Sequence, residues 1–167
     1  MSSSLALTPK TRAPGDPEAV RHFMEFVVDG ERLGQVLGPF LDLDDATDDY
    51  VTVLATDWAA GVALKELDRL LGEAVSPQLG GRTAMYVCWV CSDIGCGAVT
   101  AVVEVGDDKV VWRDFGYQND YLPFDQDAIF TGVGPFMFDR DEYWRVLEQF
   151  RSIVSETPRE PGGREPT

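Results

Sequence analysis

An alternating apolar run, a short turn and a second strand pattern constrain the fold of this chain more than any other feature. In residues 98–105, the odd-numbered positions hold only Val or Ala, and Thr100 and Glu104 fall on the even parity. Residues 106–108 are typical of a turn, and a second strand pattern follows in residues 109–115. Because alternation places each parity of side chains on one face of a sheet, the segment predicts an antiparallel β-hairpin.

Two other segments also have the composition of strands. In residues 22–28, His22 and three large apolar residues share one parity while Glu25 lies on the other, which predicts one buried and one exposed face. Residues 50–54 are mostly β-branched or aromatic, a composition typical of a strand.

Two long helices are predicted from their caps and apolar stripes. Thr56 or Asp57 can cap a helix that ends near Leu71, and Asp139 with Glu142 three residues later has the pattern of a capping box. The stripes expected to face the core are Ala60, Leu64, Leu67 and Leu71 in the first helix and Tyr143, Leu147, Phe150 and Val154 in the second.

The chain has a strong excess of negative charge, because 29 acidic residues against 14 basic ones give a net charge of -15. Such a field repels nucleic-acid phosphates and anionic membrane surfaces, so neither is an expected partner. It attracts a basic protein, although the same charge can serve solubility alone. No apolar run is long enough to cross a bilayer, and residues 1–17 lack the apolar core of a secretory signal, which favours a cytoplasmic protein.

Five aspartates are concentrated in residues 41–49. An EF-hand calcium loop would require Gly at its sixth position and Glu at its twelfth. Counted from Asp42, those positions hold Thr47 and Val53, so the segment is not such a loop. The segment is either a solvated acidic loop or a surface for a basic partner. The candidate residues are Asp42, Asp44, Asp45, Asp48 and Asp49.

A long segment rich in aromatic residues separates the hairpin from the last helix. Residues 116–136 mix aromatic side chains with Asp, Asn, Gly and Pro and show no clear periodicity. Loops of this length inside a compact domain are usually functional or mobile. We therefore group Tyr117, Tyr121 and Phe124 with the five aspartates as candidate partner-binding residues.

All three cysteines lie within nine residues, as Cys88, Cys91 and Cys96. Three thiolates favour zinc in tetrahedral geometry, with Asp93 nearby or the only histidine, His22, as the fourth ligand. Alternatively, Cys88 and Cys91 have the spacing of cysteine pairs that carry out thiol redox chemistry. Such a pair lies at the start of a helix, which lowers the thiol pKa, but the residues that follow here do not predict a helix start.

The two residues between the first cysteines argue against a metal knuckle. Trp89 and Val90 favour an extended strand over a tight turn, and a strand would point Cys88 and Cys91 to opposite faces. The cysteines would then be small buried apolar residues of a strand and of the turn after it. Packing, zinc binding and redox chemistry therefore stay open as interpretations of this segment.

Three motifs resemble a known group of sequences. Residues 86–98 read YVCxxCxDxGCGA, residues 110–116 read VVWxDFG, and residues 134–139 read GPFxFD, with Tyr143 after them. Together they resemble an uncharacterised family of small actinobacterial proteins, over roughly residues 23–154. The resemblance implies no established activity, so it assigns no catalytic residue.

These patterns predict an α+β protein with a single folded domain over residues 20–155, between a disordered leader at 1–19 and a disordered tail at 156–167. One mainly antiparallel sheet is expected to contain every predicted strand, including the cysteine segment. It packs against two or three helices, the shortest at residues 31–37.

The functional prediction follows from what the sequence contains and lacks. With one histidine and no phosphate loop, nucleotide-binding glycine motif or nucleophile elbow, an enzyme is not expected. The leading prediction is a non-enzymatic acidic protein-binding domain with an immunity-like or regulatory role. The alternative is a zinc-binding or thiol redox protein that uses Cys88, Cys91 and Cys96.

Overall fold

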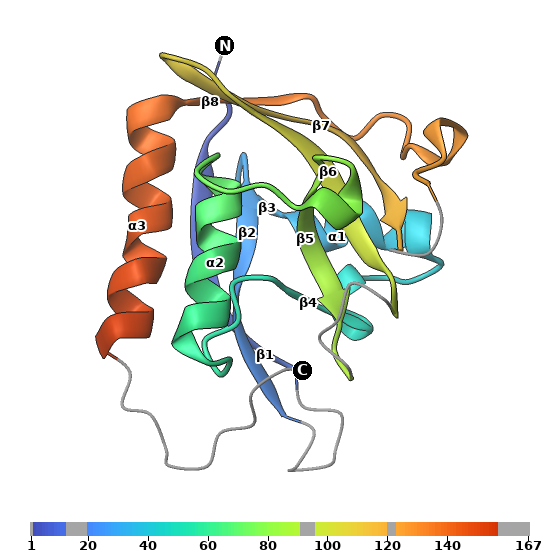
Figure 1. Ribbon diagram of the computed structural model, residues 1–167. Helices are drawn as coiled ribbons and strands as arrows, with labels where there is room; N and C mark the ends of the chain where they lie inside the picture. Colours follow the sequence, from blue (N-terminus) through green and yellow to red (C-terminus); the bar gives the residue numbers. More distant parts are fainter. Residues whose placement is uncertain (1, 13–19, 91–95, 120–122, 157–167) are drawn as a thin grey trace.

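Two antiparallel sheets and three α-helices form the part of the chain that the computed structural model describes, residues 2–12, 20–90, 96–119 and 123–156 (Figure 1). The strands are β1 (Leu5–Arg12), β2 (Arg21–Val28), β3 (Glu31–Arg32), β4 (Tyr50–Thr52), β5 (Thr83–Cys88), β6 (Ala98–Val105), β7 (Lys109–Gln118) and β8 (Phe136–Asp139). The helices are α1 (Leu33–Leu37), α2 (Ala60–Leu70) and α3 (Arg140–Glu156), with short 3-10 helices η2 (Gly38–Leu41), η3 (Ala46–Asp48), η4 (Pro77–Leu79) and η6 (Gln126–Ala128). The predicted α+β class is confirmed.

The two sheets join along both of their sides. The three-stranded sheet has the order β1-β2-β3, and the five-stranded sheet has the order β4-β5-β6-β7-β8. Met24 N in β2 donates to Leu54 O just after β4 (2.9 Å), and Ser3 N just before β1 donates to Met137 O in β8 (2.6 Å). The strands therefore curl into a partial barrel. The prediction of one sheet is wrong, because β2 forms its ladders with β1 and β3. It contacts the other sheet through a hydrogen bond from Thr52 Oγ1 of β4 to Met24 O (2.6 Å) and through a short pairing just after β4.

The N-terminal segment is a strand, so the predicted disordered leader is wrong for residues 5–12. β1 pairs with β2 along its whole length, starting with Leu5 opposite Val28. Its composition is polar and includes Pro9, but an edge strand needs only one hydrogen-bonding neighbour. Pairing with β2 therefore orders this segment, because its own composition does not favour a strand. Residues 13–19 of the predicted leader and 157–167 of the predicted tail lie outside the described ranges.

β2 is buried on both faces, although its alternation predicted one exposed face. Phe23 and Phe26 belong to opposite parities and are both buried, and Glu25 is buried with them. The reason is its position, because β2 lies where the two sheets meet and is covered from both sides. An ionisable side chain therefore lies in the core.

The predicted hairpin is confirmed as β6 and β7, with one irregularity. The register shifts between Thr100 and Val102, so Asp114 and Phe115 of β7 lie opposite the single residue between them. Asp114 adopts φ 54°, a left-handed conformation that Asp tolerates better than most residues. This β-bulge bends the strand at Asp114.

The two long helices lie side by side on one flank of the strands (Figure 1). As predicted, the Asp139 carboxylate accepts a hydrogen bond from the backbone N–H of Glu142 near the start of α3 (3.0 Å). The predicted cap of α2 is wrong, because this helix begins at Ala60 without a side-chain cap and Asp57 instead accepts a bond from the backbone N–H of His22 (2.8 Å). No helix in the described ranges is both long and apolar enough to cross a membrane.

Trp112 in β7 is the centre of an aromatic core. Its ring has edge-to-face contacts with Phe26 (centroids 5.3 Å apart), Phe138 (5.0 Å) and Tyr143 (6.0 Å). The indole N–H of Trp112 donates to the Tyr143 hydroxyl (3.1 Å), which donates to Leu70 O at the end of α2 (2.6 Å). One hydroxyl therefore connects β7, α3 and α2. The four predicted stripe residues of α3 are all buried.

We expect Tyr143→Phe to lower the free energy of unfolding by about 1–3 kcal/mol, because it leaves two buried polar groups without a partner. Chemical denaturation followed by circular dichroism measures this loss. Tyr117→Phe is the control, because that hydroxyl is on an exposed side chain and water can replace its bond to Cys96 O. We expect the control to lose no more than about 0.5 kcal/mol. Equal losses in the two variants would contradict the role of Tyr143.

Candidate protein-binding surface

Two segments far apart in the sequence meet at one aromatic contact. Phe40 in η2 stacks on Phe130, with ring centroids 4.9 Å apart and an interplanar angle of 16°. Phe130 is 8% exposed, and its backbone N–H donates to Phe115 O (2.7 Å), whereas Phe40 is 43% exposed. A large apolar ring is therefore accessible on a fixed support. Sequence analysis missed this pair, because neither segment alone indicates the contact.

The acidic turn, residues 41–45, directly follows Phe40. Leu43 N donates to Gly38 O (2.9 Å), and a Cβ on Gly38 would lie 2.7 Å from Asp44 O, so the turn folds closely over this glycine. Asp42 adopts φ 56°, which helps to reverse the chain. Asp42 and Asp44 are both exposed. Their carboxylates are therefore available within four residues of the exposed ring.

Asp45 differs from the other aspartates, because its carboxylate is already engaged. Its Oδ2 accepts a hydrogen bond from Arg32 Nη2 (2.5 Å), and its Oδ1 accepts bonds from Thr47 N (2.9 Å) and Thr47 Oγ1 (2.6 Å). Burial acts to raise the pKa of Asp45, but the hydrogen bonds from Thr47 and Arg32 outweigh it, so the pKa lies below its ordinary value. The side chain is 13% exposed and anchors the acidic turn to β3.

Arg32 also faces Glu25, the carboxyl group in the core. Glu25 is 0% exposed, and its Oε1 accepts hydrogen bonds from the Tyr86 hydroxyl (2.5 Å) and from Phe26 N (2.8 Å). Arg32 Nη1 lies 3.8 Å from Glu25 Oε2. This network connects β2 and β5 to β3 and, through Asp45, to the acidic turn. Sequence analysis missed it because alternation placed Glu25 on an exposed face.

Burial raises the pKa of Glu25 to about 7, although the hydrogen bonds from Tyr86 and Phe26 act in the opposite direction. Burial also raises the pKa of Tyr86, and the adjacent Glu25 carboxyl adds to this, so the hydroxyl keeps the proton that it donates. A Cβ on Gly34 would lie 2.7 Å from an oxygen of both Glu25 and Asp45, so the network requires glycine there.

Asp48 and Asp49 contact β1 and the cysteine segment. Arg12 Nε donates to Asp48 O (2.8 Å), and Arg12 Nη2 lies 4.0 Å from Asp49 Oδ1. The same guanidinium lies 3.8 Å from the ring centroid of Trp89, whose backbone N–H donates to Asp49 O (3.4 Å). The five predicted aspartates therefore divide into groups with different neighbours.

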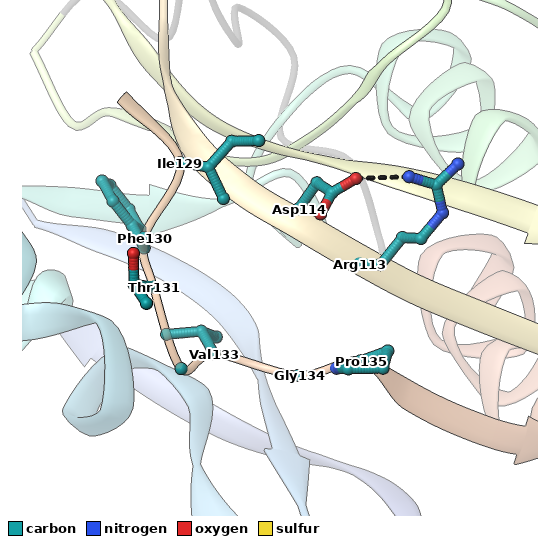
Figure 2. A pocket seen from close by; sticks show the side chains of 9 residues that line it. Arg113, Asp114, Ile129, Phe130, Thr131, Val133, Gly134 and Pro135 are labelled. Atoms are coloured by element: carbon teal, nitrogen blue, oxygen red, sulfur yellow. Dashed lines mark hydrogen bonds and ion pairs between the residues drawn. The ribbon is translucent and has the colours of Figure 1, made fainter. Parts of the chain in front are cut away.

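A pocket of about 290 Å³ lies beside Phe130 (Figure 2). Residues 129–135 precede β8 and lie beside β7. They contact β7 through the hydrogen bond from Phe130 N to Phe115 O, and the chain then pairs with β7 as β8. Asp114 and Arg113 of β7 lie across the hollow from Val133 and Pro135 (Figure 2). The lining residues are Arg113, Asp114, Ile129, Phe130, Thr131, Gly132, Val133, Gly134 and Pro135.

Phe130 belongs both to the aromatic stack and to the wall of the pocket. Phe130 therefore connects Phe40 to the pocket, and we call Phe40, the acidic turn and the pocket together the Phe40 surface. It combines an exposed ring, exposed carboxylates and a hollow with both polar and apolar lining residues. Such a surface can bind an apolar group and a positive charge at neighbouring points.

The aromatic residues that the sequence singled out lie elsewhere. Tyr117 is exposed, but its hydroxyl donates to Cys96 O (3.2 Å) and its ring lies over Gly97, where there is no space for a Cβ. Phe124 lies on the guanidinium of Arg82, 3.7 Å from the ring centroid. Tyr121 lies outside the described residues. The structure thus does not bring Tyr117 and Phe124 into the wall of the pocket.

The cysteine segment is described only in part. Cys88, the last residue of β5, is a half-buried free thiol opposite Tyr50 of β4, and Cys96 is exposed and disulfide-bonded. His22 is exposed on β2, where its Nδ1 lies 3.1 Å from Thr11 Oγ1.

Two of the five predicted zinc ligands, Cys91 and Asp93, lie outside the described residues. Within the described ranges, no group of three His, Cys, Asp or Glu side chains is placed to hold a metal ion. The zinc and redox hypotheses therefore stay predictions.

Comparisons of the chain with models of protein families, with curated proteins and with solved structures gave no match. The resemblance to a family of small actinobacterial proteins therefore stays a prediction. The role of each residue has to be argued from its own contacts.

We expect Glu25→Gln to change the pH dependence of stability. Glu25 titrates near 7 in the folded chain and near its ordinary 4.5 when unfolded, so between these values only the folded chain retains the proton. The free energy of unfolding of the wild type should therefore fall relative to Glu25→Gln as pH rises from 4.5 to 7, by about 3 kcal/mol. Urea denaturation of both proteins across this range measures the difference. A difference that does not vary with pH would show that Glu25 is not held protonated.

Proposed function

We propose that this chain is a non-enzymatic protein-binding domain that meets a basic partner through the Phe40 surface, in an immunity-like or regulatory role. The observation that carries the proposal is the exposed Phe40 ring, which is fixed by Phe130 next to the acidic turn and the pocket. Aromatic anchors surrounded by polar groups are typical of the residues that dominate binding energy at interfaces. The net charge of -15 would also steer a basic partner toward the chain.

Net charge by itself does not select this surface, because a soluble protein gains from excess charge anywhere. The selection comes from the exposed apolar side chains. In the described ranges, the large exposed apolar residues are Phe40, Val75, Val90, Tyr117 and Met137. Within this set, Phe40 alone stacks on a buried ring that also lines a pocket. Rigid aromatic groups lose little conformational entropy on binding, which favours Phe40 as an anchor.

The double variant Asp42→Asn/Asp44→Asn tests the proposal. We expect it to lower the affinity for the physiological partner about tenfold, because two carboxylates beside the anchor lose their charge. Captured proteins from a lysate of the source organism are quantified by mass spectrometry for wild type and variant at low salt. Phe40→Ala in the same series should reduce capture of the same protein.

The matched control is Asp107→Asn/Asp108→Asn, which removes the same charge from the exposed β6–β7 turn near the start of α3. We expect this control to retain the partner. Support requires a basic protein that both test variants lose and the control keeps. If every captured protein responds equally to both double variants, binding depends on net charge alone and the proposal fails.

A thiol redox function is the second candidate, and the different states of two cysteines favour it. Cys88 is a free thiol, whereas Cys96 is disulfide-bonded. A sulfur in a disulfide is not a thiolate, so this state supports redox chemistry over zinc binding.

We expect iodoacetamide to modify Cys88 in the denatured, unreduced protein and to modify Cys96 only after reduction, because a disulfide sulfur does not alkylate. Peptide mass spectrometry measures both sites. Modification of Cys96 without reductant, together with stoichiometric zinc in protein purified without chelator, would support the metal prediction instead.

A further inference from the structure

The pocket of the Phe40 surface has one carboxylate that the backbone presents to it. Asp114 occupies the β-bulge of β7 at φ 54°, and its carbonyl oxygen accepts a hydrogen bond from the buried guanidinium of Arg82. Arg82 also donates to Thr100 Oγ1 (2.9 Å) and to Thr100 O (3.1 Å). The backbone of Asp114 is therefore fixed from behind, while its side chain lines the pocket and is 39% exposed.

Two cations lie near two carboxylates at the edge of the pocket, because the buried Arg82 interacts electrostatically with Asp114 in addition to Arg113. Arg113 Nη1 donates to Asp114 Oδ2, and Arg113 Nη2 donates to Glu104 Oε1 (2.6 Å). One guanidinium thus serves two carboxylates, and all three side chains are partly exposed. Ion pairs of this exposure contribute about 0–1 kcal/mol, so an incoming cation can compete for Asp114.

The aromatic stack of Phe40 and Phe130 lies beside the pocket, and of the two rings Phe130 lines it. In the described ranges, three aromatic rings carry an arginine of the same chain: Arg12 lies on Trp89 (3.8 Å), Arg82 on Phe124 (3.7 Å) and Arg140 on Trp144 (4.8 Å). No such arginine lies on Phe40 or Phe130 in these ranges. One face of Phe40 is used by the stack, and the ring is 43% exposed.

We infer that the pocket receives one arginine side chain of the basic partner, with its guanidinium on the Asp114 carboxylate and its aliphatic part against Ile129, Val133 and Pro135. This inference rests on the proposed function and names the group that anchors the partner. The volume of about 290 Å³ lies just below the range for small-molecule sites, about 300–1,000 Å³, and suits a single side chain.

Arginine fits this site better than lysine does. A guanidinium is planar, pairs with a carboxylate through two parallel N–H groups and stacks on aromatic rings. A lysine ammonium is more strongly hydrated and binds as a point charge. The neighbouring Asp42 and Asp44 attract either residue and do not distinguish them.

The test is a titration of the full-length ¹⁵N-labelled chain with N-acetyl-arginine amide, followed by amide chemical shifts. The matched probes are N-acetyl-citrulline amide, which has the same shape without the charge, and N-acetyl-lysine amide. We expect the arginine probe to shift the amide signals of residues 113–114 and 129–134. Its affinity should be at least about fivefold higher than that of the citrulline or the lysine probe.

Two variants are expected to change the affinity for arginine in opposite directions. Asp114→Asn removes the charge and keeps a residue that tolerates the left-handed backbone, so it should weaken binding about fivefold. Arg113→Gln removes the internal competitor for Asp114 and should strengthen binding by a similar factor. Asp108→Asn is the control for net charge and should leave the affinity unchanged.

Equal binding of citrulline or lysine, or weaker binding in Arg113→Gln, would overturn the inference. Shifts confined to other residues would do the same. A failed titration together with partner capture that still depends on Asp42 and Asp44 would remove only the arginine pocket. Loss of that dependence would instead remove the proposed function.

Discussion

One buried carboxyl group, Glu25, connects the acidic turn of the Phe40 surface to the core through Arg32. Because β2 lies where two sheets meet, side chains of both parities enter the core, and Glu25 enters with Phe23 and Phe26. A buried carboxyl group needs hydrogen-bond donors, and Tyr86 and the Phe26 backbone supply them. Arg32 faces Glu25 on one side and holds Asp45 on the other. The acidic turn follows Phe40 in sequence, and Arg32 connects this turn to the core.

This arrangement avoids the full cost of a buried charge. Isolated charges in a protein interior are strongly destabilising, and a group that can exchange a proton becomes neutral instead. A pKa of about 7 means that Glu25 is protonated in a large share of molecules at neutral pH. The hydrogen bonds from Tyr86 and Phe26 can be accepted by either form. Arg32 then interacts chiefly with Asp45, where it stabilises the acidic turn.

Local signals in the sequence identified elements whose cause is local. The bond from Glu142 N to Asp139, the β6–β7 hairpin and the stripe from Tyr143 to Val154 each depend on residues within a few positions. The main errors have non-local causes. β1 is ordered by β2, and Glu25 is buried by a second sheet that its own alternation cannot reveal. The Phe40–Phe130 contact joins residues far apart in the chain, so no local pattern could predict it.

The same distinction applies to the five aspartates of residues 41–49, which have different neighbours in the structure. Asp45 stabilises the turn, Asp48 accepts a bond from Arg12 through its backbone, and Asp49 lies beside β1 and Trp89. The carboxylates of Asp42 and Asp44 form no hydrogen bond or ion pair among the described contacts. Asp114 is far from them in sequence and lies on the β-bulge of β7. A partner that recognised only negative charge would not distinguish these residues. A partner with an aromatic-binding and a carboxylate-binding group would, because among the described residues an exposed ring, a pocket and exposed carboxylates come together around Phe40 and Phe130. This coincidence, and not the charge of -15, makes the surface a specific binding hypothesis.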